Sequence, residues 1–164
     1  MKNKFFRQKE LNSSEQLESI KYAHCKILEY QFIRTELRCI IELQPVEYSR
    51  IYKLELKYDL NTYSPRKVKI WVIEPELKLP KNLANIHIWP ASGDLCLFYG
   101  NEWTPCKAIG KTIIPWATKW LLFYEAWEVT GKWLGGGIHP SSKSKPNKRD
   151  KEKSLGNPKR LLCN

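Results

Sequence analysis

Residues 37–58, LRCIIELQPVEYSRIYKLELKY, decide the fold because an alternating apolar run lies on each side of a proline. The first run places an apolar side chain at every second position: Leu37, Cys39, Ile41 and Leu43. The second run repeats the pattern with Tyr52, Leu54, Leu56 and Tyr58. A period of two is typical of half-buried β-strands, and Pro45 ends the first strand because proline cannot donate to a sheet ladder.

A third strand follows the polar turn DLNTYSP, residues 59–65. Val68, Ile70 and Val72 alternate after this turn, and Pro75 closes the run. Because the connections between the three runs are short, they predict an antiparallel meander with one face on the core and one face in water.

A helix is expected before the meander, over residues 14–30. Ser13 suits its N-cap, Gln16 follows three residues later as in a capping box, and apolar residues then recur at helical spacing. His24 and Cys25 fall inside this segment, and we interpret both as packing residues. The helix must bury its apolar side, and the sheet is the available surface.

A second helix is expected after the meander, from Pro115 at its first position to a stop at Gly131. Its aromatic side chains recur every three or four residues and predict core packing: Trp116, Trp120, Phe123, Tyr124 and Trp127. Residues 75–115 in between are rich in proline and too apolar to be disordered, so this irregular segment must pack. The predicted fold class is α+β: N-terminal helix, antiparallel meander sheet, irregular active-site segment and C-terminal helix.

The chain has 164 residues and a net charge of +11, which at first suggests a nucleic-acid partner. Eight basic and two acidic residues follow Pro140, so six of these charges belong to the last segment. We therefore expect a flexible N-terminus over 1–12, one domain over 13–140 and a basic, disordered tail over 141–164. No nucleic-acid-reading motif accompanies the basic run, which makes a nucleic-acid partner the weaker interpretation.

The five cysteines are widely spaced and include no Cys-x-x-Cys pair. The N-terminal residues lack the apolar stretch of a secretory signal, and no window approaches the length of a membrane span. These features predict a reduced, cytoplasmic protein without a membrane partner.

Cys96 stands out from the other cysteines. In HIWPASGDLCLF, residues 87–98, Pro90 and Gly93 bend the chain just before it. Such a bend provides the fixed backbone and partial exposure that a nucleophilic thiol needs, but it also suits a core thiol. A zinc site built from His87, Cys96, Cys106 and His139 is the third possibility, and the wide gaps between these residues disfavour it. No metal or other cofactor is therefore expected.

A resemblance supports the nucleophile. The segments HIWPASGDLCLFYG (87–100), EWTP (102–105) and IIPWATKWLLFYEAWEVTGKWLGGGIHP (113–140) resemble the ubiquitin-conjugating-enzyme-like proteins of bacterial CBASS anti-phage operons. These operons are built around a cyclic-nucleotide synthase related to cGAS. The resemblance covers roughly residues 14–140, and the family's fold has the same order of elements.

The resemblance implies roles for Cys96 and His87. Trp89-Pro90 and Gly93 precede Cys96-Leu97 as in the family's active-site motif, so Cys96 corresponds to the thioester cysteine. His87 falls where the general family has an asparagine, either as an oxyanion donor or as an organiser of the loop. Asp94 and His139 are possible neighbours of the site; the alternative for both is an ordinary turn residue.

The function implied by the resemblance is thioester transfer acting on the C-terminal tail of the cGAS-like nucleotidyltransferase, in ligation or in release. The chain has no Gly-x-x-x-x-Gly-Lys-Ser/Thr loop, so a separate activating enzyme is a further expected partner if ligation is the direction. A non-catalytic module that holds the synthase is the alternative, as is nucleic-acid binding by the basic tail.

Overall fold

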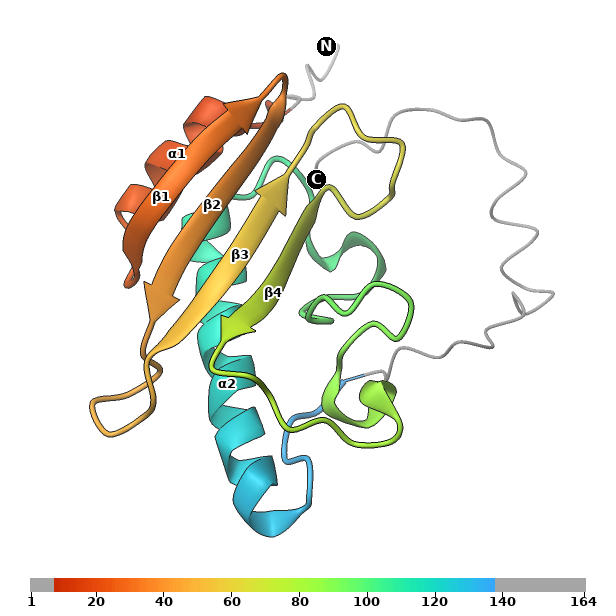
Figure 1. Cartoon of the computed structure of the whole chain (residues 1–164). Coiled ribbons are helices and arrows are strands. Elements are labelled where there is room, and N and C mark those ends of the chain that lie inside the picture. Colours follow the sequence, from red (N-terminus) through yellow and green to blue (C-terminus); the bar gives the residue numbers. More distant parts are fainter. Residues whose placement is uncertain (1–7, 138–164) are drawn as a thin grey trace, which may run out of the picture.

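The computed structural model describes residues 8–137, which form a four-stranded antiparallel sheet with two α-helices on one face (Figure 1). The strands follow one another in the order β1 (Lys26–Ile33), β2 (Glu36–Leu43), β3 (Tyr52–Tyr58) and β4 (Val68–Glu74). The helices α1 (Ser13–Lys21) and α2 (Ile113–Thr130) precede and follow the sheet in the chain. This arrangement confirms the predicted α+β class. The expected tail over 141–164, His139 and Cys163 lie outside the described residues.

The three strands expected from alternation are present as β2, β3 and β4. In β2 and β3 every second residue is buried, so the predicted apolar runs face the core. The opposite face carries charged side chains that pair across neighbouring strands, for example Lys53 with Glu74. In β4 only Val68 and Ile70 are buried. This strand is the edge of the sheet opposite β1.

The prediction of a helix over residues 14–30 is wrong for the second half of this range. The helix ends at Lys21, and residues 26–33 form the additional edge strand β1. A register shift between Ile27 and Glu29 interrupts the strand's alternation, so its apolar residues also fit a helical spacing. The two-residue turn to β2 contains Arg34 at φ 57° instead of the glycine or asparagine that usually marks such a turn.

Two smaller expectations near α1 also change. The N-cap is Asn12 and not Ser13: its side chain accepts a hydrogen bond from the Glu15 amide (3.0 Å), and the Glu15 carboxylate accepts one from the Asn12 amide (2.8 Å). His24 and Cys25 lie in the bend before β1, where His24 is exposed and Cys25 is half-buried.

Helix α1 is held against the 3₁₀-helix η3 (Ile109–Lys111), which leads into α2. Gln16 is fully buried and accepts a hydrogen bond from the Ile109 amide (2.8 Å) while donating one to the Lys107 carbonyl (3.1 Å). Gly110 packs on the α1 backbone so closely that a Cβ there would lie 1.9 Å from the Ser19 carbonyl oxygen. The two helices meet only because residue 110 has no side chain.

Helix α2 stops at Gly131, as expected. Gly131 caps the helix in a left-handed conformation, and the Gly131 amide donates to the Trp127 carbonyl (2.8 Å). The helix begins at Ile113, two residues before the predicted start. The face toward the sheet is buried: Ile113, Ile114, Ala117, Trp120, Leu121 and Tyr124. The predicted aromatic core stripe is thus split, because Trp116 and Phe123 are only half-buried and lie on another side of the helix.

Replacing Gly110 by alanine should lower the free energy of unfolding by about 1–3 kcal/mol, because the added methyl group forces α1 and η3 apart. Urea unfolding followed by far-UV circular dichroism measures this change. Gly136→Ala is the matched control, since a Cβ at Gly136 meets no atom within 4 Å and its φ is not positive. Equal stability losses in the two variants would contradict the close approach.

Candidate functional site

Cys96 closes a short hairpin that begins at His87. The Cys96 amide donates to the His87 carbonyl (2.8 Å), and the Trp89 amide donates to the Asp94 carbonyl (2.9 Å). Ile88 and Leu95 form an antiparallel bridge between these two hydrogen bonds. The short apolar pieces on either side of the bend therefore pair with each other, and this places His87 and Cys96 opposite one another at the open end of the hairpin.

Three hydrogen bonds fix this hairpin to the rest of the domain. The Leu95 amide donates to the Ile70 carbonyl of β4 (2.9 Å), and the Trp71 indole donates to the Ser92 carbonyl (2.9 Å). On the other side, the indole of Trp120 in α2 donates to the carbonyl of Ile86 (2.9 Å). The irregular segment is thus held between β4 and α2, which gives Cys96 the fixed backbone expected from the sequence.

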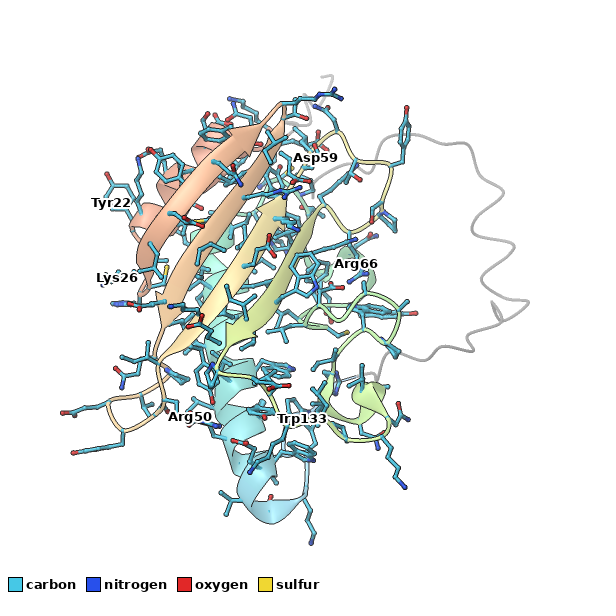
Figure 2. All side chains as sticks on the ribbon, in the orientation of Figure 1. Tyr22, Lys26, Arg50, Asp59, Arg66 and Trp133 are labelled. Carbon is cyan, nitrogen blue, oxygen red and sulfur yellow. The ribbon has the colours of Figure 1, made fainter. Side chains whose placement is uncertain are left out.

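A buried ion pair adds a fourth attachment. Asp94 is 1% exposed, and its two carboxylate oxygens accept hydrogen bonds from Arg66 and from the Ser92 hydroxyl. The Arg66 guanidinium also lies 4.4 Å from the centre of the Trp89 ring. Arg66 lies just before β4, beside the irregular segment (Figure 2). Because both oxygens of Asp94 are engaged in this way, the geometry favours a role in holding the turn over one in orienting a substrate amine.

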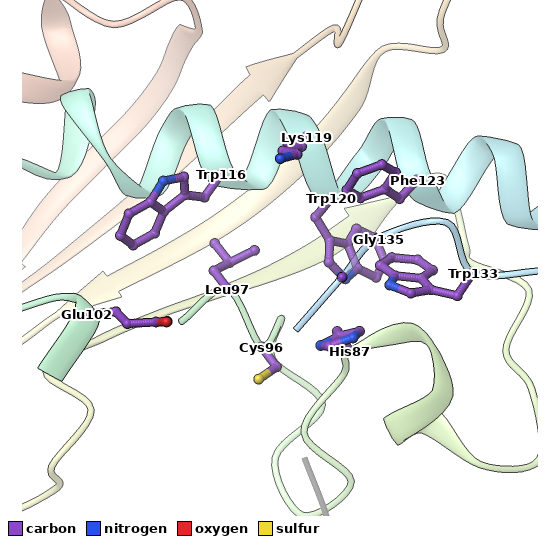
Figure 3. Close-up of a pocket in the computed structure, with 11 residues that line it drawn as sticks. His87, Cys96, Leu97, Glu102, Trp116, Lys119, Trp120, Phe123, Trp133 and Gly135 are labelled. Carbon is purple, nitrogen blue, oxygen red and sulfur yellow. The ribbon is translucent and has the colours of Figure 1, made fainter. Parts of the chain in front are cut away.

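His87 and Cys96 line the same open cavity, which has a volume of about 530 Å³ (Figure 3). The opposite wall is formed by α2 and by the segment after it. Most of the other lining side chains are apolar or aromatic: Leu97, Trp116, Trp120, Phe123 and Trp133, with Glu102, Lys119, Gly135 and Gly136 completing the wall. A mostly apolar pocket with a few polar groups and a thiol at its edge is the usual character of a ligand site.

His87 has a left-handed backbone, at φ 54° and ψ 51°, where it ends the 3₁₀-helix η1 (Leu83–Ile86). Histidine, asparagine and aspartate adopt this conformation more readily than most residues. The imidazole lies 5.6 Å from the Trp133 ring, centre to centre, and a Cβ at Gly137 would lie 3.3 Å from it. The ring is therefore held between the hairpin and the segment that follows α2.

The surroundings of the Cys96 thiol favour its protonated form. The residue is 9% exposed, and burial raises the pKa of its thiol to about 11. The positive charge of Arg66 lowers this pKa, while Asp94 and Glu102 raise it, and burial outweighs all three. Burial also raises the pKa of Cys25 to about 11, so a lowered pKa does not distinguish Cys96 from the other cysteines.

The other cysteines and the other histidine considered in the sequence analysis are not seen at the cavity. Cys39 is fully buried on β2, as expected for a core residue. Cys106 does not line the cavity, and His139 lies beyond the described residues. Within residues 8–137 no cluster of three or more histidine, cysteine or acidic side chains is arranged to hold a metal ion. No helix in this range has both the length and the apolar character to cross a membrane.

Sequence reasoning missed the aromatic wall and Arg66. The aromatic spacing predicts that Trp116 and Phe123 belong to the core. The same spacing could have indicated a second apolar surface, because α2 has more apolar residues than one side of a helix can turn toward a sheet. No local pattern marks Arg66, because its partner Asp94 is 28 positions away in the chain.

One comparison with known proteins identifies a family. The family model described as "Type II CBASS E2 protein" matches residues 16–140, which include the sheet, the Cys96 hairpin and α2. None of the curated proteins matches the chain.

Alkylation of Cys96 by iodoacetamide should accelerate about tenfold per pH unit from pH 7 to pH 10 and level off near pH 11, because only the thiolate reacts. Peptide mapping by mass spectrometry measures the rate at each cysteine. In urea the same thiol should titrate near its ordinary value of 9.0. A plateau near pH 8 would contradict the raised pKa.

Proposed function

The chain belongs to the type II CBASS E2 protein family, and on this premise we propose that it is an acyl-transfer enzyme whose nucleophile is Cys96. The acyl donor is the C-terminal tail of the operon's cGAS-like synthase, and the acceptor is an amine or water. The observation that carries the proposal is the pairing of His87 and Cys96 across the mouth of the hairpin, with both residues lining one open cavity. No other cysteine in the described part of the chain lines this cavity.

The proposed reaction has two steps. In the first, the Cys96 sulfur attacks the carbonyl carbon of an activated donor, the thiol gives up its proton, and the donor's leaving group departs with a proton. In the second, an amine attacks the new thioester, the C–S bond breaks, and the cysteine regains its proton as the amide forms. Since the resting thiol is protonated, the first step needs a proton acceptor, and the His87 imidazole is the proposed one.

Both steps pass through a tetrahedral oxyanion that needs hydrogen-bond donors. The Cys96 and Leu95 amides already donate to the His87 and Ile70 carbonyls, so neither serves in this role. The His87 imidazole and the amide of Leu97 are the candidates nearest to Cys96 in the chain and in the hairpin. Removing one such donor typically costs about 2.7–4 kcal/mol of transition-state stabilisation.

The energy for ligation must come from outside the chain. The sequence contains no phosphate-binding loop, so the donor arrives as an activated acyl group from a separate enzyme. The alternative direction, cleavage of an existing bond to the synthase tail, uses the same nucleophile and the same oxyanion donors.

A non-catalytic role is the second candidate, and one observation favours it. Cys96 is largely buried with a raised pKa, as a structural thiol is. In that case the chain holds the synthase by its surface, and no covalent adduct forms.

Incubation of the protein with its synthase, and with the operon's activating enzyme where there is one, should give a covalent adduct at Cys96. Because a thioester is cleaved by hydroxylamine and by thiols, intact-mass spectrometry before and after these reagents identifies the bond. Cys96→Ala should give no adduct, and Cys96→Ser should give a more stable ester. An unchanged adduct in Cys96→Ala would overturn the assignment, and the absence of any adduct on the native protein would favour the holding role.

The role of His87 is tested by the initial rate of adduct formation in two variants. His87→Ala should lower this rate by about 10²- to 10³-fold, because it removes both a donor and a proton acceptor. His87→Asn keeps a side-chain donor and suits the left-handed backbone, but it cannot accept the proton. Recovery in the asparagine variant would assign His87 as an oxyanion donor, whereas continued loss would assign it as the base. An unchanged rate in His87→Ala would leave only a packing role.

A further inference from the structure

We propose that the aromatic cavity beside Cys96 selects the acyl donor by binding a bulky apolar side chain close to its reacting carbonyl. This inference rests on the proposed function, since it concerns the chain that Cys96 accepts. It adds a specificity site built mainly from Trp116, Phe123 and Leu97.

The first argument is the composition and size of the cavity. About 530 Å³ is far more space than a thioester carbonyl with a small neighbouring residue needs, and it lies within the range of pockets that hold side-chain-sized ligands. The walls are chiefly indole, phenyl and leucine surfaces (Figure 3). The aromatic part of the lining favours an apolar side chain, while Glu102 and Lys119 lie elsewhere on the same wall.

The second argument is that the sheet does not use this side of α2. Leu121 and Tyr124 are buried in the core and do not line the cavity, whereas Trp116 and Phe123 line it and remain half-buried. Aromatic rings left partly exposed beside an open cavity are the usual sign of a binding surface rather than of a core.

The position of Cys96 identifies the occupant. Cys96 and His87 form part of the same wall, so any chain whose end is bonded to the sulfur begins at this cavity. Its neighbouring residues must pass either over the aromatic wall or out into water. The aromatic wall favours the first route, with the side chain inserted between Trp116 and Phe123.

The test uses short peptide α-thioesters as acyl donors for the purified full-length protein. Each of three peptide series varies one of the last three residues of the peptide. Within a series that residue is Phe, Leu or Ser, and all other residues are the same. Intact-mass spectrometry gives kcat/KM for acylation of Cys96. At one of the three positions, Phe and Leu should react at least about tenfold faster than Ser, because burying such a side chain is worth that factor or more.

A variant that fills the cavity gives the matched comparison. Gly136→Leu adds a side chain at a lining position where the backbone has room for it, and it should bring the Phe-to-Ser rate ratio close to one. Lys132→Leu adds the same side chain to an exposed position of the same segment that does not line the cavity, and it should keep the native ratio.

The outcomes separate the two proposals. If every peptide acylates Cys96 with rates within twofold of one another, the specificity site is refuted and the proposed function stands. A preference that persists unchanged in Gly136→Leu would also refute the site. If no peptide acylates Cys96, the proposed acyl transfer fails, and the specificity inference fails with it.

Discussion

The geometry of the site depends on one buried ion pair. Asp94 is 1% exposed, and a carboxylate removed from water this completely is tolerated only when it is paired and hydrogen-bonded. Arg66 and Ser92 supply those partners, and Arg66 lies in the loop just before β4, so the pair fastens the irregular segment to the loop that leads into the sheet. Because Asp94 is two residues from Cys96, the position of the sulfur follows from this attachment.

The division of α2 into two apolar faces explains how so small a domain holds both a core and a cavity. One face, which includes Leu121 and Tyr124, closes the sheet. The other presents Trp116 and Phe123 to the hairpin across open space, and the segment around Trp133 closes the far side. Trp120 joins the two regions, since it is buried against the core and its indole N–H holds the Ile86 carbonyl just before His87.

The sequence predicted the parts of the fold that have a local period and missed those that do not. The alternation in β2 and β3 located both strands, because each has one buried and one wet face. β1 is an edge strand with an interrupted register, so its pattern was mistaken for a continuation of α1. In the site, the bend and the resemblance singled out Cys96 and His87. The Arg66–Asp94 pair was beyond reach, because it joins two loops that only the folded sheet brings together.

The raised pKa of Cys96 affects both steps of the proposed reaction, the attack by the sulfur and its later departure. A thiol with a pKa of about 11 is a weak nucleophile at neutral pH, which disfavours adventitious alkylation and oxidation of the resting protein. Once acylated, the same sulfur is a poor leaving group, since a thiolate of high pKa departs slowly. In the proposed reaction, a thioester at this position would therefore resist water and ambient thiols until an amine is held close and a proton donor assists departure. His87 lies across the hairpin from Cys96 and lines the same cavity, so in the proposed reaction it is the side chain that would assist both the loading and the release of the acyl group.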